Sequence, residues 1–237
     1  MSVPTLGSLY AGVGGSDLGF ERAGFRVAWQ AECDPWRARV LAAHWDVPRA
    51  RLVEDLDFFA RAERVDLLCV TPPASDPEWL PPVWPILARL RPPFLVVTSA
   101  GRCAEALQAG FDATGYVGGV LNLTCEVRCG TGRVQRAQAF AVGARQKLPD
   151  SALGVRTFAA SPRDDRDPRS VVEVFETLVG LPAGWTCVCG QSALACSESV
   201  ARLLAANDCL SPALTEWVGR QLLAAMQRAA GLIEVGG

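Results

Sequence analysis

The stretch that decides the fold is Leu9-Tyr10-Ala11-Gly12-Val13-Gly14-Gly15, which closes the strand-like run Thr5–Tyr10. A glycine-rich turn at the end of a first strand lets the backbone approach a nucleotide-like ligand closely, at the carboxyl edge of a parallel sheet. Such a turn is a weak signal on its own. The acidic residues that follow it make the signal more specific.

Two acidic positions follow the glycines in the order that a cofactor site needs. The next strand-like run ends in Ala31-Glu32-Cys33-Asp34, which places Glu32 about 20 residues after the turn, where a carboxylate can accept hydrogen bonds from a ribose diol. Asp55 follows near the expected end of a third strand. Together these features indicate the nucleotide-binding half of a Rossmann-like domain.

Strand-like and helical segments alternate along the first half of the chain, which predicts βα units and a mostly parallel sheet in an α/β fold. A hairpin of Gly119–Glu126 and Val134–Gly143 around Gly130-Thr131-Gly132 should end the parallel order with an antiparallel pair. The expected strands are Thr5–Tyr10, Arg26–Ala31, Val65–Thr71 and Phe94–Ser99, and the expected helices are Asp17–Ala23, Pro35–His44, Trp79–Leu90, Ser170–Val179, Ser197–Ala205 and Pro212–Ala230.

Composition limits the classes of function. The 237 residues are enough for one substantial core, so we expect a single domain over residues 1–237, with residues 148–169, rich in Pro, Asp, Arg and Ser, as a solvated loop. A net charge of -2 argues against a strongly electrostatic nucleic-acid binder. No apolar run reaches the about 18 residues that a membrane helix needs. We therefore expect no membrane association.

Cysteine and histidine usage points to a reduced compartment and away from a metal site. Nine cysteines without a tight framework suit buried thiols in the cytoplasm better than disulfides. The pairs Cys125/Cys129 and Cys187/Cys189 resemble zinc pairs only loosely, and the chain has one histidine. We predict no bound metal.

The segment Leu6–Leu56 resembles motifs I to III of the DNA cytosine-C5 methyltransferases, which bind S-adenosylmethionine. The resemblance implies that Tyr10 stacks on the adenine, that Glu32 holds the ribose hydroxyls and that Asp55 reaches the adenine amino group. It implies S-adenosylmethionine or S-adenosylhomocysteine as the ligand. The implied cofactor contacts are Tyr10, Ala11, Gly12, Gly14, Gly15, Glu32, Cys33, Asp55, Leu56, Pro72 and Asn207.

The catalytic motifs of that family are changed here. Asp66–Ser75 is similar to the motif whose cysteine attacks C6 of cytosine, but Ala74 stands at the nucleophile position, and alanine offers no nucleophile. Thr98 stands where the family has its acid, and Ala137 and Ala139 stand where it has two arginines. The resemblance therefore implies a catalytically inactive protein.

The parts that handle DNA are short, whereas the C-terminal motifs persist. The segment that corresponds to the family's catalytic loop is short, about Ser75–Pro82. Residues 148–169 stand in place of the target-recognition region, and this segment is too small to form a separate module. Arg169–Trp185 resembles motif IX, and Ala206-Asn207-Asp208-Cys209-Leu210 resembles motif X. The resemblance thus spans nearly the whole chain, and we expect DNA binding to be weak or indirect.

Several alternatives stay open. The first expectation is a methyltransferase-like pseudoenzyme that works through an active methyltransferase, a DNA-processing complex or self-association. The apolar stripe of the last helix can serve self-association, although packing against the protein's own sheet is the favoured use; its residues are Leu214, Val218, Leu222 and Met226. The others are a divergent S-adenosylmethionine-dependent transferase and an active cytosine-C5 methyltransferase. Thr71-Pro72-Pro73 also resembles the motif of amino-methyltransferases, without its aromatic residue. Cys69 and Cys103 are weak candidates for a replacement nucleophile.

Overall fold

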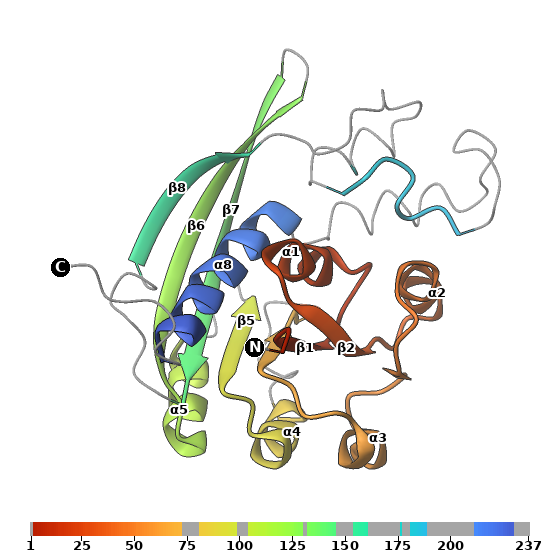
Figure 1. Cartoon of the computed structure of the whole chain (residues 1–237), viewed down its shortest axis with the longest axis vertical. Coiled ribbons are helices and arrows are strands. Elements are labelled where there is room, and N and C mark those ends of the chain that lie inside the picture. The colour runs from red at the N-terminus through yellow and green to blue at the C-terminus, as the bar shows by residue number, and fades with distance from the viewer. Residues whose placement is uncertain are drawn as a thin grey trace.

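The computed structural model describes residues 2–72, 81–98, 104–129, 132–145, 154–160, 176, 181–188 and 211–229. One eight-stranded sheet runs through this part of the chain in the order β3-β2-β1-β4-β5-β7-β6-β8 (Figure 1). The strands are β1 (Thr5–Leu9), β2 (Arg26–Ala31), β3 (Arg49–Ala50), β4 (Leu67–Val70), β5 (Phe94–Thr98), β6 (Val117–Cys129), β7 (Gly132–Ala144) and β8 (Gly154–Ala160). The helices are α1 (Gly15–Ala23), α2 (Pro35–His44), α3 (Leu56–Arg61), α4 (Val83–Leu90), α5 (Ala104–Thr114) and α8 (Pro212–Ala229).

The predicted fold class is confirmed. The strands from β3 to β5 pair in parallel, and β8 pairs in parallel with β6. β7 is antiparallel to both β5 and β6, so the long hairpin ends the parallel order where the sequence predicted. Strand β2 has the predicted bounds, Arg26–Ala31, and helix α2 has the predicted bounds, Pro35–His44.

Helices cover the two faces of the sheet with two separate apolar clusters. On one face, Phe20 of α1 and Leu214 of α8 pack with strand residues such as Leu6. On the other face, Phe59 of α3, Ile86 of α4 and Phe111 of α5 pack against the strands. Burying one such side chain stabilises a fold by about 1.5–3 kcal/mol, so this layering accounts for the βα pattern of the sequence.

Helices α1 and α8 pack closely against each other on the same face of the sheet (Figure 1). A Cβ added at Gly19 would overlap Thr215 Oγ1 and the backbone oxygen of Pro212, and one added at Gly219 would lie 2.7 Å from Ala23 Cβ. The contact therefore depends on glycine at both positions.

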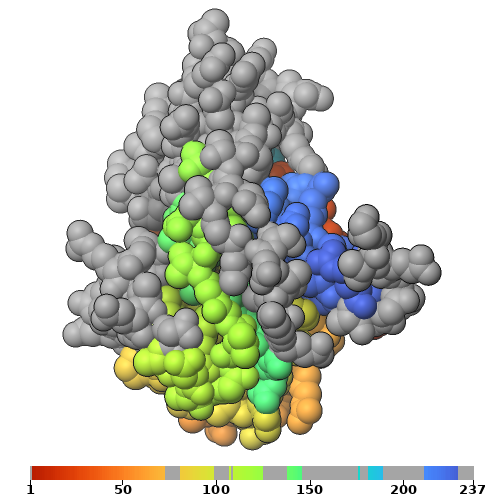
Figure 2. All heavy atoms as spheres, turned by 90° about the vertical axis from the view of Figure 1, so that its left-hand side faces the viewer, coloured from red at the N-terminus to blue at the C-terminus, as the bar shows by residue number. Residues whose placement is uncertain are grey.

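The apolar stripe of α8 is used inside the protein. Leu214, Val218 and Leu222 are each 1% exposed and belong to the core cluster that contains α1, while Met226 packs against its edge. Helix α8 also contacts β6, and the blue surface of α8 and the green surface of β6 are both visible on the side shown in Figure 2. The stripe thus packs mainly against α1, and its buried members are not free for self-association.

The structure also differs from the sequence-based expectations. The third strand, expected to end near Asp55, is the short β3, Arg49–Ala50. Helices α3 and α5 were not predicted, and β8 occupies Gly154–Ala160 inside the expected loop 148–169. Pairing with β6 explains β8, because seven of its residues align with Leu121–Val127. The predicted helix Ser197–Ala205, and Ser170–Val179 apart from Glu176, lie outside the described residues. Within those residues, no helix is long and apolar enough to cross a membrane.

Candidate cofactor-binding site

The glycine turn connects β1 to α1 through a left-handed backbone. Tyr10, Gly12 and Gly14 have positive φ values of 54°, 61° and 84°. Gly14 N–H donates to the Ala11 carbonyl at 3.0 Å, which closes the turn directly before the first residue of α1. A positive φ is unusual for a residue with a side chain, so Tyr10 holds a conformation that the surrounding turn imposes.

Gly12 and Gly14 are glycines for different reasons. A Cβ at Gly14 would overlap the ring of Trp45, so close packing under the turn excludes a side chain there. A Cβ at Gly12 would meet no atom within 4 Å. The open side of Gly12 is therefore the place where a ligand can approach the backbone of the turn.

Glu32 borders this open side of the turn. It is 7% exposed and directly follows β2. Its Oε2 accepts a hydrogen bond from Gly12 N–H at 2.7 Å, and its Oε1 accepts one from Asp34 N–H at 2.9 Å. Cys33 Sγ also lies 3.9 Å from Oε1 as a weak donor. Two carboxylate oxygens have about four acceptor positions in total, so Glu32 can bind the turn and keep an acceptor position on Oε2 for a hydroxyl group. The ribose contact stays a prediction.

Tyr10 and Cys33 lie near each other and near Glu54, which follows β3. Burial raises the pKa of Tyr10 to about 12, with further contributions from the negative charges of Glu54 and Cys33. Burial and the charge of Glu32 raise the pKa of Cys33 as well. Both side chains are therefore neutral at pH 7 and present a ring and a thiol beside the acids.

Asp55 and Leu56 begin helix α3. Asp55 Oδ1 accepts from Phe58 N–H at 2.9 Å and so caps the helix, a role that the sequence did not predict. Leu56 is 49% exposed. Because Oδ1 is used in the cap, the predicted contact of Asp55 with the adenine would need its second oxygen, and it stays a prediction.

The segment after β4 passes on the other side of the turn. Thr71 N–H donates to the Leu9 carbonyl at 3.0 Å, and Thr71 Oγ1 lies 3.0 Å from Ser16 Oγ in the first turn of α1. Pro72 follows at this position. Residues 73–80, which include Ala74, lie outside the described residues, as does Asn207.

The described catalytic positions carry no ionisable group. Thr98 is 5% exposed, and its Oγ1 donates to the Val70 carbonyl at 3.4 Å. Ala139 lies on β7, one residue before the partner of Thr98 in the sheet, and Ala137 lies two residues earlier, where its backbone pairs with Thr124. Neither hydroxyl nor methyl groups can replace an acid or a guanidinium at these places.

Cys69 should be unreactive in the folded protein. It is fully buried on β4, and burial, followed by the charge of Asp17, raises its pKa to about 12. Its thiolate fraction at pH 8 is then on the order of 1,000-fold below that of an ordinary thiol. We expect a disulfide reagent to modify exposed Cys33 within minutes and Cys69 only in denaturant, as measured by peptide mass mapping. Equal labelling of both in native protein would contradict this.

A second segment, residues 181–188, contacts both the glycine turn and helix α2. Trp185 Nε1 donates to the Val13 carbonyl at 2.8 Å, and the ring of Trp185 stacks on His44 with centroids 3.5 Å apart. Glu176, fully buried, accepts from Gly184 N–H at 2.6 Å and from Thr186 N–H at 2.9 Å. The sequence marked this segment as a motif but did not identify Glu176 as its buried acceptor, because only the folded turn brings the two backbone N–H groups to its carboxylate.

His44 is at the end of α2, as expected, but it is not an isolated surface residue. Its Nε2 lies 2.7 Å from the Trp185 carbonyl, and burial lowers its pKa. The ring is therefore mostly neutral at pH 7 and helps to hold the segment 181–188 on α2.

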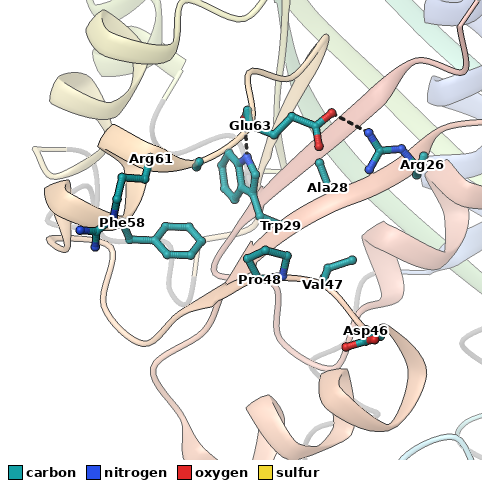
Figure 3. Close-up of a pocket in the computed structure, with 10 residues that line it drawn as sticks. Arg26, Ala28, Trp29, Asp46, Val47, Pro48, Phe58, Arg61 and Glu63 are labelled. Carbon is teal, nitrogen blue, oxygen red and sulfur yellow. Dashed lines mark hydrogen bonds and ion pairs between the residues drawn. The ribbon is translucent and has the colours of Figure 1, made fainter.

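A separate pocket of about 330 Å³ lies at the other end of the strands (Figure 3). Trp29 and Phe58 form its aromatic wall, and the ion pair of Arg26 and Glu63, 2.6 Å long, stands on its rim. Arg26 begins β2, whereas Glu32 follows the end of that strand. The pocket is therefore not the predicted cofactor site.

Residues 5–76 match the family of C-5 cytosine-specific DNA methylases. No curated protein sequence gives a significant match to the chain. Among solved structures, a candidate DNA modification methyltransferase encoded within an E. coli prophage shares the fold, with a TM-score of 0.66 at 12% identity over 94% of this chain and 99% of that one.

A precorrin-6y C5,15-methyltransferase from Geobacter metallireducens GS-15 gives a TM-score of 0.46 at 12% identity, over 60% of this chain and 78% of that one. The prophage structure shows the fold. The resemblance predicted from the sequence is confirmed over residues 5–76, the segment that carries the glycine turn, Glu32 and Asp55 and that matches the C-5 cytosine-specific DNA methylases.

Proposed function

We propose that this protein is a catalytically inactive relative of the C-5 cytosine-specific DNA methylases that binds S-adenosylmethionine and acts through a protein partner. The observation that carries the cofactor part is the carboxylate of Glu32, held by Gly12 N–H at 2.7 Å beside the open face of the turn. A ribose diol placed there would donate to the free acceptor positions of this carboxylate. Tyr10 would supply the ring beside the adenine.

Inactivity follows from the groups at the catalytic positions. Cytosine methylation needs a thiolate at C6 and charged groups that hold the extruded base. Ala74 and Ala139 supply neither, and Thr98 already donates to a backbone carbonyl. Cys69 is buried and protonated, so it is no substitute nucleophile.

The partner role is supported by what the chain retains and what it lacks. A cofactor turn without a nucleophile can still stabilise a domain that docks on an active methyltransferase or a DNA-processing complex. The net charge of -2 favours a protein partner over direct, strong DNA binding. The free thiols of Cys33, Cys69 and Cys187 suit the cytoplasm as the place of action.

A methyl-transfer assay separates the proposal from its two alternatives. Labelled S-adenosylmethionine is incubated with duplex DNA and, in a second arm, with a cell lysate, using the Glu32→Ala variant as background and an active cytosine methylase as positive control. We expect no label above background in either arm. Label in DNA cytosine would establish an active enzyme, and label in another macromolecule would establish a divergent transferase.

Restoring the nucleophile alone should not restore activity. Ala74→Cys supplies the thiol, but Thr98, Ala137 and Ala139 still lack the acid and the two arginines of the family. Because residues that act as one catalytic unit are strongly non-additive, we expect no turnover on duplex DNA. A covalent complex with 5-fluorocytosine DNA, or measurable methylation, by Ala74→Cys would show that the rest of the site is functional.

A further inference from the structure

Three buried polar side chains meet behind the glycine turn: Ser8 on β1, Asp17 on α1 and Gln30 on β2. Each is 0% exposed. Gln30 Nε2 donates to Asp17 Oδ2 at 2.9 Å. Ser8 Oγ, Asp17 Oδ1 and Gln30 Oε1, however, have no hydrogen-bond partner among the described residues. Buried polar atoms in folded proteins are nearly always satisfied, so three adjacent exceptions indicate a missing common partner.

The chemistry of the three atoms identifies that partner. Asp17 Oδ1 and Gln30 Oε1 only accept hydrogen bonds, whereas the Ser8 hydroxyl can donate. A water molecule donates twice and accepts, and internal waters typically make about three hydrogen bonds of this kind. Ser8 is near enough to Asp17 to lower its pKa, yet their free oxygens lack direct bond geometry. We propose that Ser8, Asp17 and Gln30 bind one internal water molecule that links β1, α1 and β2.

The location of this hydrated cluster gives it a role in positioning the cofactor turn. Asp17 lies in the first turn of α1, two residues after Gly15. Gln30 lies on β2, and Glu32 directly follows the end of that strand. The cluster therefore fixes the start of α1 relative to the strand end that carries Glu32. Asp17 is a positioning residue, because it acts on the ligand only through the turn.

The charge of Asp17 couples this position to pH. Burial raises the pKa of Asp17 to about 6, and the charge of Glu21 on α1 raises it further. On β4, Cys69 is a neutral thiol, and on α8, Glu216 is paired with Arg220 at 2.7 Å. No basic side chain forms an ion pair with Asp17 in the part of the chain that the structure describes.

The sign of the pH effect follows from the raised pKa. The folded state binds this proton more tightly than the unfolded state, so the stability contribution is complete below about pH 4 and is lost as pH rises through about 6. Between these values the folding equilibrium should weaken about 100-fold for this one group. Asp17→Asn removes the titration and offers a donor to the free oxygens of Ser8 and Gln30.

Urea denaturation at pH 5.0 and pH 7.5 tests the coupling, with Asp57→Asn, an exposed acid on α3, as matched control. We expect Asp17→Asn to stabilise the protein about 30-fold or more at pH 7.5 and far less at pH 5.0, and Asp57→Asn to have no such pattern. Equal effects at both pH values would show that Asp17 does not titrate in this range and would overturn the coupling.

A high-resolution crystal structure of the wild type tests the water itself and does not depend on any variant folding. We expect one density peak within hydrogen-bond distance of all three orphan oxygens. An empty site would overturn the proposal. The proposal would also be overturned if sodium or potassium chloride stabilised the folded protein more than choline chloride does, because that result would identify a cation at the site. The positioning role rests on the proposed function, and its readout is the pH dependence of S-adenosylhomocysteine affinity, which Asp17→Asn should flatten.

The two proposals can fail separately. If wild-type protein does not bind S-adenosylhomocysteine at any pH, the proposed function fails, while the density peak and the stability difference still decide the cluster. If it binds with the same pH dependence in wild type and Asp17→Asn, the positioning role fails alone.

Discussion

Gly19→Ala should destabilise the protein, which reverses the usual effect of this substitution inside a helix. Alanine normally stabilises a helix relative to glycine by about 1 kcal/mol. Here the added Cβ would overlap Thr215 Oγ1 and the Pro212 carbonyl oxygen and lie 2.9 Å from Glu216 N. Two of these atoms are backbone, so α1 and α8 must separate. We expect the free energy of unfolding to fall by about 3 kcal/mol in urea denaturation.

The second variant Thr215→Ala serves as a probe of the same contact. It removes the side-chain atom of the overlap but leaves the backbone of Pro212 and Glu216, so the double variant should recover part of the loss and not all of it. A Gly19→Ala protein as stable as the wild type would show that α8 does not lie this close to α1. The close packing of α8 on α1 would then be wrong.

Glu32→Ala should weaken the binding of S-adenosylhomocysteine about 100-fold. A hydrogen bond to a charged group contributes about 1.5–3 kcal/mol, and the ribose diol loses its acceptor in this variant. Gly12 N–H and Asp34 N–H also lose theirs, so the turn itself becomes less well defined. Isothermal titration calorimetry measures the change directly.

Two further variants isolate the cause. Glu32→Gln keeps one acceptor oxygen but turns an amide donor toward Gly12 N–H or Asp34 N–H. Its affinity for S-adenosylhomocysteine should therefore lie between those of the wild type and Glu32→Ala. Glu63→Ala removes an exposed acid at the opposite end of the strands and should leave affinity unchanged. Equal losses in Glu63→Ala and Glu32→Ala would mean that net charge, and not the ribose contact, controls binding.

The parts of the fold that the sequence predicts are those with a local signal. Strand β2 is an almost continuous buried run. Helix α2 has a clear start signal, because Asp34 precedes Pro35, and the structure confirms that Asp34 Oδ1 caps the helix by accepting from Arg37 N–H at 2.8 Å. Strand β3 has only two residues and α3 only six, too few for periodicity to show. Strand β8 sits in polar sequence and exists through its pairing with β6.

The site divides in the same way. Glu32 was predictable because its position after a strand and a glycine turn decides its direction. The contact of Asp17 with Gln30 was not, because it joins residues on different elements whose register only the folded sheet sets. The cap made by Asp55 was missed because α3 itself was missed.

Titration of the wild-type protein with S-adenosylhomocysteine by isothermal calorimetry tests the proposed cofactor site at the glycine turn most directly. We predict saturable heat with a one-to-one stoichiometry and a matching rise in the unfolding temperature. No heat and no thermal shift, with protein that is folded and monodisperse, would contradict the account and leave the glycine turn, Gly12 and Glu32 as structure without a ligand.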